Sequence, residues 1–495
     1  MGTEMGPKLE FTNVVVTTVE PLEATSHVET IDPTDNDMFA IDGYLPTLFA
    51  YRLADNSDVL YREMVDRIKQ GLRKVLVPFF PWAGRWIAIP EGRGRRLVCN
   101  DKGIPFIEAR VVDKDLDSVL RISSEFRPVP ELQGYGVLGM KEASFKQRML
   151  PDGLPCAFAQ VTRFRCGGLV VAVTFNHMLA DGKSLLQFLT AWSDFSRTGT
   201  TDMIMDHNRA AIQGENPGSL PSDTFDDAPT TNPWKTKSYE GTTDMIMDHN
   251  RAAIQGENPG SLPSDTFDDA PTTNPWKTKS YEVRASVIES LKREVNKSGD
   301  GAYVSTMDCI YAHMLKSASS LPFSITGGKE IGVLNAVDGR TRFYDPPVPN
   351  LLGNITTIMR APKIKTDELL NMPLSIIATK IRDKIATTKR ETWLSPERVG
   401  EAMDVFVNKN ILPWGQTCWS SFPMYSIYFG FGTPFFAPGL NSPISQKKLG
   451  NSYIGPPTPG VASSAAFMQV MSTPKVLEAL EQQPDFLQFF LPLQN

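Results

Sequence analysis

An apolar run that ends abruptly at a histidine limits the possible folds of this chain more than any other stretch. Residues 168–175 are apolar and mostly β-branched, which is typical of a buried strand. His177 follows almost at once, then Asp181 and Gly182, and apolar residues recur over 183–192 at helical spacing. The stretch therefore predicts a strand, a tight turn that carries His177, and a helix, within a domain of the α/β class.

The position of His177 indicates a catalytic role. The end of a buried strand is a common position for a general base. Histidine suits this role because the ordinary pKa of its imidazole lets it take up a proton near neutral pH. A packed or capping histidine is the alternative interpretation, and it is favoured for His313, which lies inside a predicted helix. At His177 the His-x-x-x-Asp-Gly spacing between a strand and a helix favours catalysis.

Charge and cysteine usage exclude several classes of protein. The chain has 495 residues and a formal net charge of −6, and its one basic cluster, 92–96, is explained by a hairpin turn, so nucleic acid is not an expected partner. No apolar run approaches the ~20 residues that span a bilayer. The five cysteines are scattered and no Cys/His spacing fits zinc. We therefore expect a cytoplasmic protein with unpaired thiols, no membrane segment and no metal.

Hydrophobic periodicity predicts strands and helices in both halves of the chain. In the first half it predicts strands within 9–19 and at 45–52, 156–164 and 169–175, and helices over 58–75 and near 115–130. In the second half it predicts a strand at 331–337 and helices over 283–298, 306–317, 368–390 and 474–484. Each half thus has the mixture expected of an α/β domain.

Between the halves, residues 199–240 are repeated without a single change as 241–282. The segment is rich in Pro, Gly, Ser, Thr and Asp, which is the composition of a linker. Two identical polar copies indicate a tandem duplication, or an error in assembling the coding sequence, because solenoid repeats diverge and need about three copies to build a core. We therefore predict domains at 1–198 and 283–495 joined by a linker at 199–282, which the family resemblance described below makes a crossover, and no catalytic role for the duplicated His207 and His249.

Four blocks of the sequence resemble motifs of the BAHD acyl-CoA-dependent acyltransferases, a family found mainly in plants. The first block is the His-x-x-x-Asp-Gly pattern at 177–182. The others are 76–85, 337–342 together with 352–354, and 428–432. They occur in the family's order and spacing once one 42-residue copy is removed, so the resemblance covers nearly the whole chain.

The resemblance implies two similar domains like those of chloramphenicol acetyltransferase, with a channel between them and His177 at its centre. Acyl-CoA would be a co-substrate, with no permanently bound cofactor. A small alcohol or amine would accept the acyl group. A hydroxycinnamoyl or other aromatic acyl group would suit the family. His177 would remove the acceptor's proton without an acyl-enzyme, and the chain has no Gly-x-Ser-x-Gly elbow to supply a nucleophile. A monomer is expected.

The resemblance also assigns roles to residues around the histidine. Asp181 and Gly182 would support the site, with Asp181 paired to Arg340 of the second domain rather than acting on substrate. Thr417 would donate a hydrogen bond to the oxyanion of the reaction, and Trp419 would line the channel.

The last block departs from the family pattern. Tyr428 stands where the family has aspartate, and Phe431 stands where it has tryptophan. Phe431 and Gly432 are candidates for the channel lining, and the missing carboxylate puts the usual polar contacts of this loop in doubt.

Two other functions stay open at this point. One is a catalytically silent relative that binds acyl-CoA or a partner protein, which the altered 428–432 block favours. The other is an acyl-CoA hydrolase or a condensation-type domain that shares the His-x-x-x-Asp pattern. The intact His177, Asp181 and Gly182 favour the acyltransferase.

Overall fold

The computed structural model describes residues 9, 11–25, 30–34, 36–37, 40, 43–53, 57–89, 95–120, 152–208, 277–297, 303–388, 404–405, 408–437 and 449–493. Three predictions fall outside these residues in whole or in part: the turn at 92–94, the helix beyond residue 120, and the crossover over 209–276 with His249.

The first half of the chain builds a five-stranded mixed sheet around the strand that leads to His177. Its order is β1-β6-β7-β8-β3, with β6 and β7 parallel and the other neighbours antiparallel. All eight residues of β8 are buried, as its apolar sequence predicts. The strands are β1 (Phe11–Val19), β3 (Tyr44–Tyr51), β6 (Ile104–Val111), β7 (Ala157–Phe164) and β8 (Leu169–Asn176).

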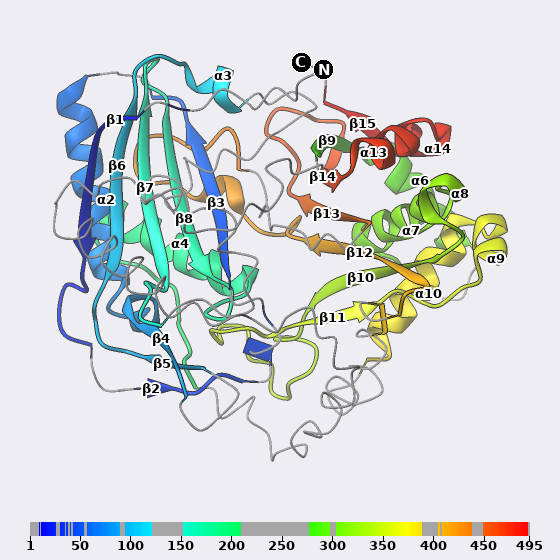
Figure 1. The fold of residues 1–495 in the computed structure, drawn as a ribbon, viewed down its shortest axis with the longest axis horizontal. Helices are drawn as coiled ribbons and strands as arrows, with labels where there is room; N and C mark the ends of the chain where they lie inside the picture. The colour runs from blue at the N-terminus through cyan, green and yellow to red at the C-terminus, as the bar shows by residue number, and fades with distance from the viewer. Residues whose placement is uncertain are drawn as a thin grey trace, which may run out of the picture.

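Two long amphipathic helices, α2 (Asp58–Val75) and α4 (Gly182–Thr198), pack side by side against this sheet (Figure 1). The indole N–H of Trp192 in α4 donates to the carbonyl of Ile68 in α2 at 2.9 Å. A Cβ on Gly71 would lie 2.0 Å from the hydroxyl oxygen of Ser196, so glycine permits this close approach. The helix predicted over 58–75 is confirmed with the same bounds.

Smaller elements complete the first half. A three-stranded sheet has the order β2-β5-β4 and lies at the lower end of the large sheet in Figure 1. The elements are β2 (Thr30–Ile31), η1 (Phe80–Ala83), β4 (Arg85–Ala88), β5 (Arg95–Val98) and α3 (Leu116–Leu120).

The second half builds a seven-stranded sheet of order β11-β10-β12-β13-β14-β9-β15. Its strands are β9 (Lys277–Arg284), β10 (Glu330–Asp338), β11 (Thr356–Arg360), β12 (Ile411–Cys418), β13 (Gly450–Gly455), β14 (Ser464–Ser472) and β15 (Phe490–Pro492). Its helices are α6 (Ala285–Lys297), α7 (Thr306–Ser319), α8 (Phe323–Thr326), η7 (Met424–Ser426), α9 (Thr366–Asn371), α10 (Leu374–Ala386), α13 (Pro474–Glu481) and α14 (Pro484–Phe489). In the described residues, no helix is both long and apolar enough to cross a membrane.

Alternate residues of this second sheet face two different cores, because strand side chains alternate between faces. Ile454 and Met468 lie in the core that α7 and α10 cover. Tyr453 and Phe467, one residue away in each strand, join the core of the first half. The second sheet therefore presents one face to its own helices and the other to the first sheet.

Two predictions in the second half are wrong in detail. Val283 and Arg284 end strand β9, and the helix expected from 283 begins at Ala285. The helix expected over 368–390 is two helices, α9 and α10, which separate at Met372 and Pro373. A residue before proline avoids the helical conformation, which ends α9 at this point.

The segment around the 428–432 block, which departs from the family pattern, crosses from the second half to the first. The backbone N–H of Ala50 in β3 donates to the carbonyl of Phe436, and Phe435 donates back to the carbonyl of Ala50, both at 2.9 Å. The Tyr51 hydroxyl donates to the carbonyl of Ile427 at 2.9 Å. Residues 427–437, placed by sequence in the second domain, thus extend the edge of the first sheet, because their apolar side chains are buried there.

The ends of the repeated segment have separate structural uses. In the first copy, the ring of His207 lies against Phe80 and bonds the carbonyl of Pro78 at 2.7 Å. In the second copy, residues 277–282 form most of β9, although the sequence assigns them to the crossover. The run is mostly polar, like a linker, but in the sheet the neighbouring strands bury residue 278 and residues 280–283.

Deleting one copy is expected to leave folding and activity intact. Because the copies are identical, removing either gives the same 453-residue chain, whose single copy supplies both the segment that contacts Pro78 and strand β9. A shorter connection lowers the cost of loop closure by only about 1 kcal/mol. Thermal denaturation and steady-state rates check this, with further deletion of the same six residues, 277–282, from the shortened chain as a control that should unfold the second sheet. A clear drop in kcat of the shortened chain would contradict the prediction.

Candidate active site

His177 lies on the turn directly after β8, where its side chain is half-buried. Its ring Nδ1 is 3.0 Å from the carbonyl oxygen of Ala180, an acceptor, so in the neutral ring the proton resides on Nδ1. Nε2 then carries a lone pair, and no described residue forms a hydrogen bond to it. The arrangement leaves one ring nitrogen ready to accept a proton.

Backbone contacts from three segments hold the turn in place. The N–H of His177 donates to the carbonyl of Gly43 at 2.9 Å. The side chain of Asn176 accepts from the N–H of Met178 at 2.8 Å. The side-chain amide of Asn354, from the second half, donates to the carbonyl of His177 at 2.9 Å. The turn is therefore bound by both halves of the chain.

Asp181 points away from the imidazole into a buried ion pair with Arg340. Both guanidinium NH groups reach the carboxylate, at 2.8 and 3.0 Å, and the two side chains are 3% and 1% exposed. The same carboxylate caps α4 by accepting the N–H of Ser184 at 2.9 Å, and it accepts the N–H of Ile355 at 2.9 Å. Two parallel hydrogen bonds between a guanidinium and a carboxylate fix the relative orientation of the two side chains and are stronger than bonds between neutral groups.

The charges of this pair shift the pKa of both groups. Burial acts to raise the pKa of Asp181, but the charge and hydrogen bonds of Arg340, with the N–H groups of Ser184 and Ile355, outweigh it and lower the pKa. Burial acts to lower the pKa of Arg340, and Asp181 outweighs it in turn. Both groups are therefore ionised at neutral pH, so Asp181 cannot serve as a proton donor.

Gly182 permits contact between the two halves. A Cβ on this residue would lie 2.6 Å from three atoms of the Trp419 indole, so any larger side chain would displace the indole. Trp419 is buried, and its ring lies against Phe422 and Tyr453. The end of β12 is thereby fixed against the start of α4, five residues beyond His177.

Thr417 lies near the end of β12, opposite Tyr453 of β13. Its side chain is half-buried, and its hydroxyl forms no hydrogen bond to a described residue. Among the described residues no hydrogen bond joins Thr417 to His177, and Trp419 provides the link between this strand and the histidine turn.

Phe431 contacts the first half rather than His177. The ring of Phe431 lies 4.9 Å from that of Tyr51, edge to face, and stacks on Phe429. Gly432 is exposed and has a φ of 115°, a conformation that favours glycine. At the variant position, the Arg197 guanidinium lies 5.4 Å from the centre of the Tyr428 ring, a cation–π contact where the family has a carboxylate.

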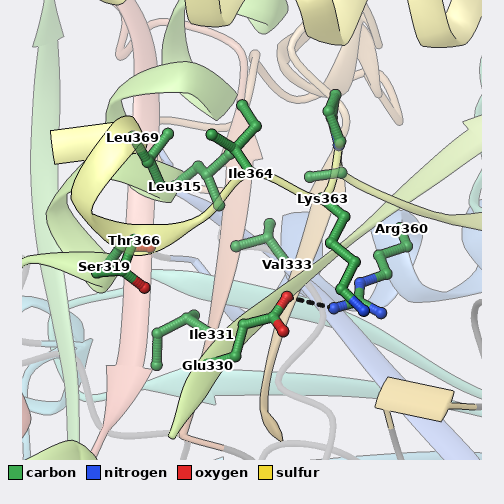
Figure 2. A pocket seen from close by; sticks show the side chains of 12 residues that line it. Leu315, Ser319, Glu330, Ile331, Val333, Arg360, Lys363, Ile364, Thr366 and Leu369 are labelled. Carbon is green, nitrogen blue, oxygen red and sulfur yellow. Dashed lines mark hydrogen bonds and ion pairs between the residues drawn. The ribbon is translucent and has the colours of Figure 1, made fainter. Parts of the chain in front are cut away.

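The remaining titratable candidates lie outside this site. Burial lowers the pKa of His313 to about 4, and its ring lies tilted against Phe489 while Nδ1 contacts the hydroxyl of Ser317. Among the described residues no group of three or more His, Cys, Asp or Glu could hold a metal ion. Figure 2 shows a pocket between α7, α9 and β10, where Arg360 pairs with Glu330. It lies on the helix-covered face of the second sheet and has no histidine in its lining.

The fold is that of the two-domain acyltransferases. The chain is similar to the crystal structure of vinorine synthase, with a TM-score of 0.65 and 18% identity over 97% of this chain and 98% of that one. It is also similar to Fusarium graminearum TRI101 complexed with coenzyme A and T-2 mycotoxin, with a TM-score of 0.59 and 14% identity over 94% and 99% of the two chains. The predicted α/β fold class is confirmed.

The chain belongs to the Transferase family, whose model matches residues 9–484, and the predicted membership of the BAHD acyltransferases is confirmed. It is 26% identical to agmatine coumaroyltransferase-1 of Hordeum vulgare over 81% of this chain and 82% of that protein. It is 23% identical to shikimate O-hydroxycinnamoyltransferase of Nicotiana tabacum, over 81% and 83%. The family membership also confirms the predicted activity class, acyl-CoA-dependent transfer to a hydroxyl or amine.

Two residues at the turn were not identified as functional from the sequence. Asn354 belongs to one of the family-like blocks, and Asp37 lies in none of them. The structure brings the side chain of Asn354 to the carbonyl of His177 and the carboxylate of Asp37 to the side chain of Asn354. Their separation of 317 residues hides this contact from local patterns.

Proposed function

We propose that the protein transfers a hydroxycinnamoyl or other aromatic acyl group from coenzyme A to a small hydroxyl or amine acceptor, with His177 as general base. The observation that carries this is the ring geometry of His177, whose Nδ1 is committed to Ala180 and whose Nε2 is free of described partners. The named acyl groups of the barley and tobacco relatives support the aromatic donor.

In the proposed reaction, Nε2 of His177 takes the proton from the acceptor as its oxygen or nitrogen attacks the thioester carbonyl. The carbonyl oxygen becomes negative, and the Thr417 hydroxyl, which has no described partner, donates to it. The tetrahedral intermediate collapses by breaking the carbon–sulfur bond. The imidazolium returns its proton to the departing thiolate, which leaves free coenzyme A and the ester or amide.

The other predicted residues have supporting roles. Asp181 and Arg340 hold the second half against the base of α4, and Gly182 admits the indole of Trp419. Phe431 and Gly432 shape the loop at the edge of the first sheet. We further propose a cytoplasmic monomer, since all five cysteines are unpaired and both partners of the buried ion pair belong to one chain.

Release of free thiol tests the proposal. The protein is incubated with coumaroyl-, feruloyl-, benzoyl- and acetyl-CoA, each with and without agmatine or shikimate, and the thiol is followed with a colorimetric reagent. We expect release only when an acceptor is present, with an aromatic donor preferred. Release without acceptor would indicate a hydrolase, and binding of acyl-CoA without release across the panel would indicate a silent relative.

A further inference from the structure

Asp37 is a fully buried carboxylate that the proposed chemistry does not use. It is 0% exposed and lies in helical backbone before β3. One oxygen, Oδ2, accepts from both the N–H and the hydroxyl of Thr34, each at 2.9 Å. The other, Oδ1, accepts from the N–H and the side-chain amide of Asn354, at 3.2 and 2.9 Å. The carboxylate thus joins the first half of the chain to the second.

Asn354 connects this carboxylate to the histidine turn. Its Nδ2 also donates to the carbonyls of His177 and Met178, at 2.9 and 3.1 Å. The side chain of Asn354 is buried, so an amide N–H without an acceptor here would lower the stability of the folded protein. A carboxylate only accepts, which determines that the NH₂ end of the amide faces Asp37 and both carbonyls.

We propose that Asp37 is a positioning residue for the transfer reaction, acting through the amide of Asn354 on the backbone of His177. It sets the orientation of the amide, the amide holds the carbonyl of His177, and the backbone determines where Nε2 points. Displacement of a base by about 1 Å can cost on the order of 100-fold in rate. The inference rests on the proposed role of His177 as base.

The test uses Asp37→Asn, which keeps the shape of the side chain but replaces one acceptor by a donor. If the NH₂ group introduced at position 37 faces Asn354, it opposes the N–H donors of that residue. The side-chain amide of Asn354 then leaves the carbonyls of His177 and Met178. We expect kcat to fall by roughly 10- to 100-fold while KM for acyl-CoA stays within about twofold, because misplacing the base affects the chemical step.

Asp101→Asn is the matched control. Asp101 accepts from the N–H and hydroxyl of Thr25, as Asp37 does from Thr34, and has no contact with the histidine turn. Asp101 is half-buried, whereas Asp37 is fully buried and accepts more hydrogen bonds, so the Asp101 variant should lose less stability and keep kcat. Equal kcat in the two variants would overturn the proposal.

A double-mutant cycle separates positioning from a general loss of structure. In a His177→Ala background, Asp37→Asn should lower the residual rate no further, since its effect passes through the missing ring. A further drop of the same factor would overturn the proposal. Should Asp37→Asn fail to fold, Asn354→Ala removes the same link from the other side and is subjected to the same cycle. Full activity of His177→Ala alone would instead refute the proposed function.

Discussion

Replacing His177 by alanine is expected to lower kcat for acyl transfer by about 10²- to 10⁴-fold, the usual contribution of a general base. The ring is half-buried, and its one described side-chain hydrogen bond is to the carbonyl of Ala180, so folding should be little affected. Initial rates of thiol release at saturating acyl-CoA and acceptor measure the effect, and thermal denaturation confirms that the variant is folded.

The chain offers a control of the same residue type. His207 also bonds a backbone carbonyl, that of Pro78, and lies against Phe80, but it stands on the crossover. His207→Ala should keep the rate within about twofold, since it lies outside the proposed proton path. If both variants retained full activity, the assignment of the base would be wrong.

Replacing Arg340 by methionine is expected to destabilise the protein by about 3–5 kcal/mol, because it leaves the buried carboxylate of Asp181 without its cation. Arg340 also donates to the carbonyls of Leu351 and Gly353, and both bonds would be lost. Urea denaturation at pH 7 measures the change in the free energy of unfolding. Arg165→Met is the control, since its pair with Asp115 is exposed and should contribute far less.

The pH dependence checks the same pair. The folded pKa of Asp181 lies below its unfolded value of about 4, so the stabilisation is complete above roughly pH 5 and is lost as pH falls through the folded pKa. Without Arg340, burial raises the folded pKa above the unfolded one, and the variant gains stability as acid neutralises the carboxylate. The difference between the two proteins should therefore narrow from pH 7 to pH 4. A constant difference would show that Asp181 is not the charge involved.

Elements with a strong periodic pattern were predictable from the sequence. Helix α2 has the predicted bounds, and β8 ends within one residue of the prediction. Elements whose pattern depends on neighbours were not. Residues 277–282 are polar by composition, and only pairing with β14 makes them a strand. Residues 427–437 lie on the first sheet because that sheet has an open edge at β3.

The sequence by itself determined the histidine turn, the α/β class and the family, because each depends on short spacings along the chain. The pairing of Asp181 with Arg340, 159 residues away, followed from the family resemblance. Only the tertiary structure showed the contact of Asp37 with Asn354, 317 residues away, which closes a second buried contact between the two halves. Buried polar groups must find partners wherever the fold supplies them, and this requirement has no signature in local sequence.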